Sequence, residues 1–436
     1  MKRLIIEKLR NWKESKRRKP LILRGARQVG KTWILKEFGK EFQDGFVFIN
    51  FDKEPEYSQF FEKTKDVERI IQNLAFASGK KITKNTLIIF DEIQACPNAL
   101  NSLKYFYEDA PDYYVVSAGS LLGLTLSGGF PVGKVDFLDM GPMTFEEFLL
   151  ASKEDSLVNY INSIDTIENL PDVFHNRLIE KLKMYFVIGG MPEAVKVWTE
   201  DNDIKEVDHI LSSIIDAYEN DFGKHTPVSD VPKIRYIWDS LPSQLAKENK
   251  KFLYSVVKHG ARAREYENAL NWLVNADLAR KVSRITNPHL PIKAYEDLTS
   301  FKIYMNDVGI LRRHSSLSSQ AFMEENRLFI EFKGALTENF VLESLINMFE
   351  TKPYYWSDDS HEVDFIIQTN SNIYPVEAKA GTNVKSSSAK AYLAKYDNTK
   401  LCIRFSLKNF SYDGKILNIP LYLIDKTNKI LELINK

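Results

Sequence analysis

Residues 25–32 read GARQVGKT, and the rest of the chain can be interpreted outward from this stretch. The stretch fits GxxxxGK[ST], the pattern of a loop that binds phosphate groups. Residues 20–24 (PLILR) are short and apolar, which predicts a buried strand. Residues 33–42 (WILKEFGKEF) place their apolar side chains mostly on one helical face, which predicts a helix. Strand, loop and helix in this order give the pattern its physical meaning.

The residue types of the loop explain how it would bind phosphate. Successive backbone N–H groups form a site for an anion, and the start of the helix adds partial positive charge. Gly25 and Gly30 let the backbone approach phosphate because no Cβ intervenes. Lys31 would reach the β- and γ-phosphates of ATP, and the Thr32 hydroxyl would ligate Mg²⁺. The predicted nucleotide-binding residues are Gly25, Ala26, Arg27, Gln28, Val29, Gly30, Lys31 and Thr32.

A second nucleotide signature lies at residues 86–92, which read TLIIFDE. An apolar run that ends in two acids predicts a buried strand with carboxylates at its C-terminal end, where open α/β sheets bind ligands. Asp91 would hold Mg²⁺, and Glu92 would act as general base on the attacking water. The pattern is weak alone, but it gains weight because it follows the glycine loop with a predicted strand, residues 45–51, in between.

A third feature is the strand predicted at residues 113–118 (YYVVSA), which ends at Gly119 and Ser120. A small polar side chain at such a strand end is placed to sense the γ-phosphate, so we assign Ser120 a catalytic role beside Lys31 and Glu92. The alternative is a serine that only stabilises a turn.

The overall charge of the chain gives no support for binding to nucleic acid. Lys plus Arg and Asp plus Glu are both 59, so the net charge is zero and only local patches could support nucleic-acid binding. The two cysteines, Cys96 and Cys402, are too few and too far apart for a disulfide framework or a metal-ligand set. No secretory leader and no apolar run of about 18 residues is evident. We therefore expect a cytoplasmic protein without a membrane contact.

Five stretches together resemble a widespread group of prokaryotic AAA-type P-loop ATPases: GARQVGKT (25–32), LIIFDEIQ (87–94), AGS (118–120), PMTFEEFL (142–149) and YFVIGGMPEAV (185–195). The resemblance extends through most of the chain. In that group the ATPase domain precedes a conserved C-terminal region of uncharacterised function. The resemblance implies ATP and Mg²⁺ binding at Lys31, Thr32, Asp91 and Glu92, and a helical lid after the core.

The segment 226–320 has the order of elements of a winged helix-turn-helix. Helices are expected at residues 234–245, 252–257 and 261–275, and a strand at 278–285. Arg262 and Arg264 would begin the last helix, at the end that faces base edges in this motif. Contact with double-stranded DNA is one interpretation, and a protein-interaction module with solvated charges is the other.

The segment 321–436 resembles the PD-(D/E)xK nuclease fold. Asp364, Glu377 and Lys379 follow D-x12-E-x-K, and Glu338 lies on a preceding predicted helix. The three acids would ligate Mg²⁺, and Lys379 would orient the attacking water at the same second metal site. The pattern is short, and the alternative is a hairpin whose charged side chains are simply solvated.

The fold class predicted from these observations is α/β: an AAA-type P-loop parallel sheet with a helical lid, then a winged helix-turn-helix and an α/β nuclease-like domain. The predicted boundaries are 1–150, 151–225, 226–320 and 321–436. The predicted function is Mg²⁺-dependent ATP hydrolysis coupled to a DNA-binding or nuclease-like module. The alternative is a nucleotide-dependent switch or scaffold in a signalling or defence assembly with an inactive C-terminal fold. Candidate partners are ATP, double-stranded DNA and another protein, and an oligomer is compatible with the sequence.

Overall fold

The chain divides into two compact units in the computed structural model, which describes residues 1–125, 133–224, 226–247, 250–323, 330–349, 351–369, 372–382, 386–399 and 401–434. The first, here the N-terminal unit, comprises Lys2–Gly141 and Asn271–Leu278. The second, here the C-terminal unit, comprises Met1, Pro142–Leu270 and Ala279–Lys436. The four segment boundaries expected from the sequence stay a prediction.

The N-terminal unit contains a five-stranded parallel sheet in the order β2-β3-β4-β1-β5. Its apolar stretches form strands because β-branched and aromatic side chains fit a surface buried on both faces. The four strands expected from the sequence are confirmed, and β5 was not expected. The strands are β1 (Leu21–Arg24), β2 (Phe46–Asn50), β3 (Leu87–Asp91), β4 (Tyr114–Ala118) and β5 (Asp136–Asp139).

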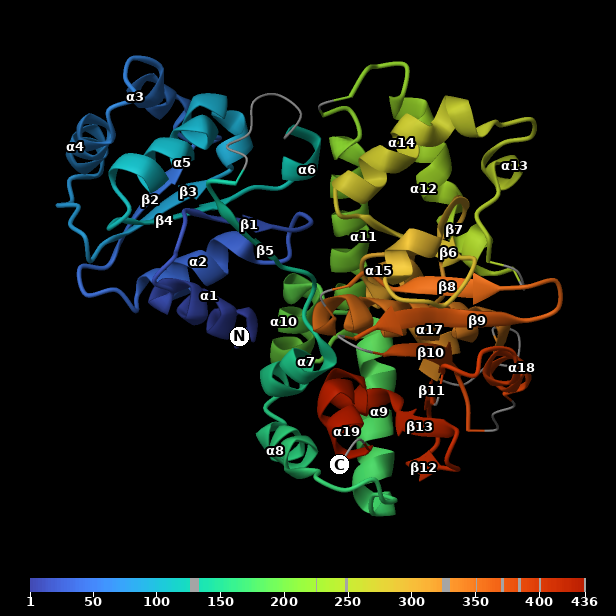
Figure 1. The fold of residues 1–436 in the computed structure, drawn as a ribbon. Helices are drawn as coiled ribbons and strands as arrows, with labels where there is room; N and C mark the ends of the chain where they lie inside the picture. Colours follow the sequence, from blue (N-terminus) through green and yellow to red (C-terminus); the bar gives the residue numbers. More distant parts are fainter. Residues whose placement is uncertain are drawn as a thin grey trace. The chain divides into compact units, whose positions relative to one another are not determined.

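Helices cover both faces of this sheet, as Figure 1 shows for α1 and α2 on one side and α4 and α5 on the other. Alternate residues of β3 point to opposite faces. Ile88 and Phe90 therefore pack in the core on the side of α4 and α5. The helices of this unit are α1 (Ile5–Glu14), α2 (Lys31–Gly39), η1 (Pro55–Ser58), α3 (Gln59–Glu62), α4 (Val67–Ser78), η2 (Ile93–Ala95), α5 (Pro97–Asp109) and α6 (Leu122–Thr125).

The C-terminal unit begins with helices. Its α7 starts at a capping box, in which Thr144 and Glu147 each bond the other's backbone N–H. The helices up to the first strand are α7 (Phe145–Ala151), α8 (Asp155–Ser163), α9 (Asp172–Ile188), α10 (Pro192–Asp201), α11 (Ile204–Asp221), α12 (Val231–Leu245), α13 (Tyr254–Val257) and α14 (Ala263–Asn275). The last residues of α14 belong to the N-terminal unit.

One mixed sheet of eight strands organises the rest of the C-terminal unit, in the order β12-β13-β11-β10-β9-β8-β6-β7. The hairpin β6/β7 comes from the segment expected to be a winged helix-turn-helix, and it joins β8 of the next segment through parallel pairing of Ile285 with Trp356. The strands are β6 (Ala279–Ile285), β7 (Glu296–Met305), β8 (Tyr354–Ser357), β9 (Glu362–Gln368), β10 (Ile373–Ala378), β11 (Cys402–Ser406), β12 (Ser411–Tyr412) and β13 (Ile416–Pro420). The remaining helices are η3 (Ile292–Tyr295), α15 (Val308–His314), α16 (Ser319–Met323), α17 (Ile330–Met348), α18 (Ser387–Lys395), η5 (Leu421–Lys426) and α19 (Thr427–Ile434).

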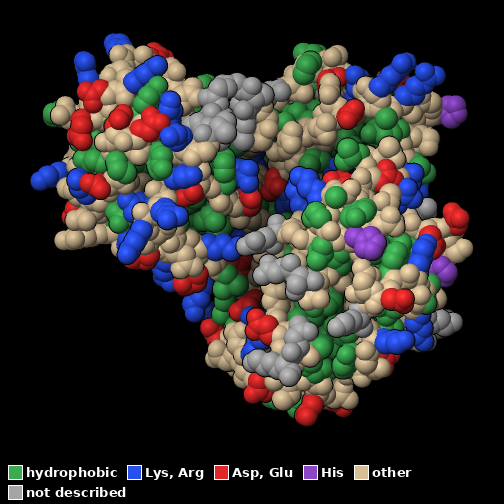
Figure 2. Space-filling view, viewed as in Figure 1, with side chains coloured by type: hydrophobic (Ala, Val, Ile, Leu, Met, Phe, Trp, Pro, Cys, Tyr) green, Lys and Arg blue, Asp and Glu red, His purple; other side chains and the backbone are tan. Residues whose placement is uncertain are grey.

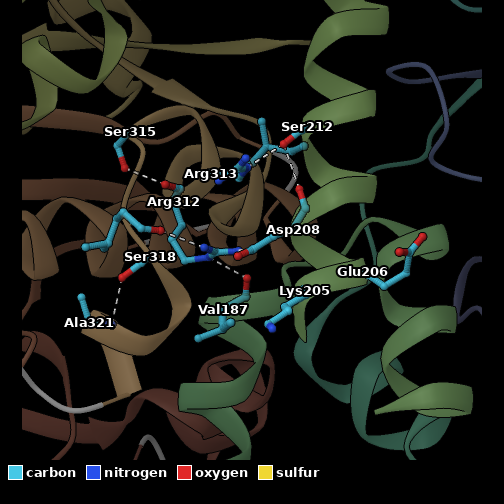
Figure 3. Close-up of polar contacts among 12 residues, drawn as sticks. Val187, Lys205, Glu206, Asp208, Ser212, Arg312, Arg313, Ser315, Ser318 and Ala321 are labelled. Atoms are coloured by element: carbon cyan, nitrogen blue, oxygen red, sulfur yellow. Dashed lines mark hydrogen bonds and ion pairs between the residues drawn. The ribbon is translucent and has the colours of Figure 1, made fainter. Parts of the chain in front are cut away.

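A buried arginine ties three helices of the C-terminal unit together (Figure 3). Arg312 on α15 is fully buried, and its guanidinium forms an ion pair with Asp208 on α11. Its Nε donates to the backbone oxygen of Val187 on α9 at 2.8 Å, and its Nη1 donates to that of Leu317 at 2.8 Å. A buried guanidinium needs such partners because an unpaired charge in the interior is costly.

The surface reflects the balanced composition. Figure 2 shows Lys and Arg side chains interspersed with Asp and Glu over the face of the molecule that is drawn. Among the described residues, no helix is both long enough and apolar enough to cross a membrane.

Candidate functional site

The glycine loop lies between β1 and α2, as its sequence context predicts. Gly25 has φ of 148°, and a Cβ there would come within 2.0 Å of the backbone oxygen of Met140, so only glycine fits. Gln28 and Gly30 have φ of 65° and 95°, and Gly30 is the N-cap of α2. These left-handed residues turn the chain sharply into the helix.

The other residues of the loop differ in exposure. Ala26 and Val29 are buried, Arg27 is half-buried and Gln28 is exposed. Arg3, which precedes α1, supports the loop from behind: its Nη1 donates to Val29 O at 2.7 Å and its Nη2 to Gly141 O at 2.7 Å. The sequence did not reveal this role, since a lone arginine near the start of a chain carries no motif.

Lys31 is the buried cation of the loop. Its Nζ donates to the backbone oxygens of Gly25 at 2.8 Å and Ala26 at 2.7 Å, which holds the ammonium inside the loop. Burial lowers the pKa of Lys31 from 10.5 to about 8, although the carboxylates of Glu92 and Asp91 act in the opposite direction. A cation in so dry a setting attracts phosphate strongly, because less water screens it.

Thr32 and Asp91 meet across the site. The Thr32 hydroxyl lies 3.1 Å and 3.0 Å from the two carboxylate oxygens of Asp91 and donates to them. Asp91 ends β3, and its burial raises the pKa of the carboxyl, while the hydrogen bond from Thr32 lowers it. A hydroxyl beside a carboxylate is a pair of oxygen ligands of the kind that Mg²⁺ prefers.

Asn50 is a member of this site that the sequence analysis missed. It ends β2 directly opposite Asp91 in the parallel register, and its Nδ2 donates to Asp91 Oδ2 at 3.0 Å. Its Oδ1 accepts from the backbone N–H groups of Asp52 and Lys53, which fixes the orientation of the amide. The sequence does show a polar residue, Asn50, at the end of the apolar run FVFIN. Only the register of β2 with β3 shows that this residue faces Asp91.

Glu92 follows Asp91 in a left-handed conformation with φ of 48°. Its Oε2 accepts a hydrogen bond from the Ser120 hydroxyl at 3.3 Å and another from the Gln94 amide. The structure therefore brings Ser120 to Glu92, as expected of side chains at adjacent strand ends. Gln94 was not singled out from the sequence. The catalytic and metal-binding roles of these residues stay a prediction.

The second set of predicted site residues lies in the C-terminal unit. Asp364 on β9 accepts from the backbone N–H of Ala378 at 2.8 Å, and Lys379 Nζ lies 3.7 Å from Asp364 Oδ2. Glu377 on β10 accepts from Ala389 N at 3.1 Å, and its Oε2 is buried with no hydrogen-bond partner among the described residues. The pattern D-x12-E-x-K thus converges on one end of the β9/β10 hairpin.

Burial and nearby lysine side chains shift the pKa values of the residues in this second set. Burial raises the pKa of Glu377. Burial would also raise that of Asp364, but the ammonium groups of Lys379 and two further lysines outweigh it and lower the pKa. The carboxylate of Asp364 raises the pKa of Lys379 to about 12. Asp364 and Lys379 therefore form a charged pair at neutral pH.

Glu338 on α17 is held by residues that the sequence did not suggest. Its carboxylate forms an ion pair with Lys250, and its Oε2 accepts from the Tyr304 hydroxyl at 3.1 Å. Lys302, two residues before Tyr304 on β7, pairs with Glu362. In the part of the chain that the structure describes, no group of three or more His, Cys, Asp or Glu side chains is arranged to hold a metal ion.

Family models match three segments of the chain. Residues 17–149 match the AAA domain. Residues 179–321 and 333–424 match two families described as domains of unknown function, DUF8612 and DUF4143. No curated protein matches the chain.

Solved structures provide distant likenesses. The Walker-type ATPase paby2304 of Pyrococcus abyssi is 15% identical with a TM-score of 0.44, and the alignment covers 71% of this chain and 94% of that one. The RuvB Holliday junction branch migration motor of Thermotoga maritima is 11% identical with a TM-score of 0.31, over 63% and 88% of the two chains. The Orc1 protein of Aeropyrum pernix, solved in complex with DNA, is 11% identical with a TM-score of 0.27, over 73% and 92%. Likenesses this distant say nothing about function. The family match agrees with the glycine loop, the strand order and the acid pair. Residues 17–149 therefore form an AAA-type P-loop domain.

Proposed function

We propose that the N-terminal unit binds Mg·ATP and hydrolyses it. The observation that carries the proposal is the meeting of Thr32 with Asp91 at 3.0 Å, directly beside the loop that contains the buried Lys31. Two motifs that are 59 residues apart in the sequence thereby form one site for a metal-bound triphosphate. Lys31 and the loop N–H groups bind the phosphates.

Glu92 is the general base in this proposal. It accepts a proton from water as the water oxygen attacks the γ-phosphorus, and the bond to the ADP oxygen breaks. Thr32 and Asp91 would hold Mg²⁺, which when bound neutralises charge on the phosphates. Asn50 keeps the Asp91 carboxylate in place through its hydrogen bond at 3.0 Å.

The proposal is tested by changing Glu92 to Gln. The variant should retain affinity for a fluorescent ATP analogue, while steady-state turnover falls by about 100-fold or more, since a general base is lost. Glu37→Gln on α2 is the matched control, because Glu37 is half-buried, pairs with Lys40 and lies outside the site. Absence of Mg·ATP binding by the wild-type protein would refute the proposal. Binding with negligible wild-type turnover would favour the alternative, a nucleotide-dependent switch or scaffold in a signalling or defence assembly.

A second candidate function is phosphodiester cleavage by the C-terminal unit, in the manner of PD-(D/E)xK nucleases. The supporting observation is the order α17-β8-β9-β10-α18-β11, in which β9 pairs antiparallel with β10 and β10 pairs parallel with β11. Asp364, Glu377 and Lys379 project from this hairpin, and the paired carboxylates of Asp364 and Glu377 offer oxygen ligands of the kind that a divalent cation prefers. A bound Mg²⁺ would stabilise charge on the phosphate, and Lys379 would orient the attacking water.

Cleavage of labelled duplex and single-stranded DNA with Mg²⁺ or Mn²⁺ tests this second candidate. Changing Asp364 to Asn or Lys379 to Ala should abolish cleavage, whereas the exposed Asp359 can be changed to Asn as a control. Cleavage that persists in both site variants would remove these residues from the chemistry. A protein without cleavage would leave this fold as a docking module.

DNA binding by the segment 226–320 is the proposed link between the two activities. The order α12, α13, α14, β6 and β7 is that of a winged helix-turn-helix, and Arg262 and Arg264 are exposed at the start of α14. ATP turnover measured with and without duplex DNA tests the coupling. Stimulation that disappears in Arg262→Ala/Arg264→Ala supports it, and equal turnover with and without DNA contradicts it.

A further inference from the structure

Two residues from motifs quoted above have no role in the proposed function, and the structure brings them together. Gln94 is the last residue of LIIFDEIQ, and Gly119 is the middle residue of AGS after β4. A Cβ on Gly119 would lie only 2.2 Å from Gln94 Oε1, so the amide fills the space that the glycine leaves. The two motifs are therefore complementary parts of one arrangement at adjacent strand ends.

The backbone around Gln94 is held firmly. Ile93, within η2, is fully buried in the core of the sheet and the helices α4 and α5. The turn is closed by Ala95 N donating to Glu92 O at 2.9 Å and by Cys96 N donating to Ile93 O at 3.0 Å. Glu92 itself takes the left-handed conformation, which is uncommon for a residue with a side chain and is concentrated at functional sites. This turn aims Glu92 and Gln94 at each other.

Both side-chain donors in this arrangement bind the same oxygen of Glu92. The Gln94 amide nitrogen and the Ser120 hydroxyl donate to Oε2, the latter at 3.3 Å. Two donors on one oxygen restrict the rotation of the carboxylate and leave its other oxygen, Oε1, outside these two hydrogen bonds. The carbonyl oxygen of the Gln94 amide is buried without a hydrogen-bond partner among the described residues.

An unpaired buried carbonyl oxygen costs free energy, and a side chain chosen only for packing would avoid that cost. An apolar side chain of the same length would fill the space above Gly119 without it. Among the described residues the side-chain amide makes one hydrogen bond, the bond to Glu92, so the benefit of an amide at this position lies in that bond.

We propose that Gln94, seated on Gly119, is a positioning residue that holds Glu92 in the orientation needed to accept a proton from the attacking water. The inference rests on the proposed ATP hydrolysis, and it adds a residue that acts only through the general base. Gln94 does not contact the nucleotide in this proposal, so it affects the rate of the chemical step and leaves ATP binding unchanged.

The test compares Gln94→Met with the wild-type protein. Methionine keeps the length of the side chain but donates no hydrogen bond, so kcat should fall about tenfold, the effect of losing one aligned hydrogen bond. KM and the affinity for a fluorescent ATP analogue should change by less than about twofold, because ground-state binding is untouched. Gln72→Met on the exposed face of α4 is the matched control and should behave as wild type.

A second variant displaces the Gln94 amide without changing residue 94. Gly119→Ala would place a methyl group 2.2 Å from Gln94 Oε1, and also 2.9 Å from Leu122 Cγ, so it should displace the amide and reproduce the loss of kcat. Gly223→Ala is its control, because a Cβ at Gly223 meets no atom within 4 Å.

Combining Gln94→Met with Glu92→Gln distinguishes a positioning role of Gln94 from a structural role. Because Gln94 acts only through the Glu92 carboxylate, Gln94→Met should change neither residual turnover nor nucleotide affinity in that background. An equal loss in both backgrounds, or wild-type kcat in Gln94→Met and Gly119→Ala, would overturn the inference. Wild-type protein without turnover would instead refute the proposed function itself, so the two failures are distinguishable.

Discussion

Lys31 carries its charge into the interior of the protein, and this charge has a cost that can be measured. Burial lowers its pKa from 10.5 to about 8, so the unfolded chain binds more protons at this position between those two pH values. Stability contributed by this residue therefore rises with pH from 8 to 10.5, and the full cost is present below pH 8. The cost is on the order of 3 kcal/mol at most.

We predict that Lys31→Met is more stable than the wild-type protein at pH 7 and loses this advantage by pH 10.5. Methionine has a similar length without the charge, although the bonds from Lys31 Nζ to the loop carbonyls are lost and reduce the gain. Urea unfolding of both proteins at several pH values measures the difference. Lys36→Met, half-buried on the same helix, is the comparison variant. A stability difference that does not vary with pH would contradict the assignment.

Among the elements of the C-terminal unit, α9, α11 and α15 depend on the buried guanidinium of Arg312. Its ion-pair partner is Asp208 (Figure 3), and burial lowers the pKa of Arg312. Asp208→Ala should destabilise the unit by about 3 kcal/mol, because it removes the ion-pair partner of a buried guanidinium. Arg313→Met is the comparison, since Arg313 makes a hydrogen bond to Ser212 at 2.6 Å from a half-buried position, and it should cost about 1 kcal/mol or less. Equal effects in chemical denaturation would contradict a special role for Arg312.

Lys250 supplies a further prediction at the scale of elements, because it brings a cation from the segment before α13 to Glu338 on α17. An ammonium group at a carboxylate competes with a divalent ion for the same oxygen atoms. We predict that Lys250→Met binds Mn²⁺ about tenfold more tightly than the wild-type protein, since one nearby like charge is worth ~1 kcal/mol or more. Isothermal titration measures the affinity, and Lys352→Met, at an exposed position, is the control. Unchanged affinity in Lys250→Met would show that Lys250 does not limit access of a cation.

The same elements show what the sequence could predict and where it could not. Apolar runs that end in acids predicted β3 and the place of Asp91, because the pattern is local. The contact of Asn50 with Asp91 depends on the register of β2 with β3, and the contact of Tyr304 with Glu338 depends on β7 joining the sheet through β6. The alternation of apolar and polar residues along a strand shows which side chains are buried. It does not show the register of β2 with β3, nor that β6 pairs with β8. Site residues supplied by a neighbouring element were therefore missed.

At the scale of the whole molecule, two compact units share one chain. A ligand that binds only the folded form of one unit stabilises that unit by RT ln(1 + [L]/Kd), about 2.7 kcal/mol at 100 times the dissociation constant. The proposed nucleotide site lies wholly within the N-terminal unit. Mg·ATP should therefore raise the thermal transition of that unit and leave the transition of the C-terminal unit unchanged.

Differential scanning calorimetry with the Glu92→Gln variant tests this expectation without loss of ATP during the scan. Two transitions are expected, of which one moves upward by several degrees with Mg·ATP, and Glu92→Gln/Lys31→Met should abolish the shift because the phosphate-binding cation is gone. A single transition that moves as a whole would show instead that the two units unfold together. Duplex DNA should then shift the thermal transition of whichever unit binds it. A shift of the C-terminal transition alone supports the proposed winged helix-turn-helix. A shift of the N-terminal transition alone contradicts it.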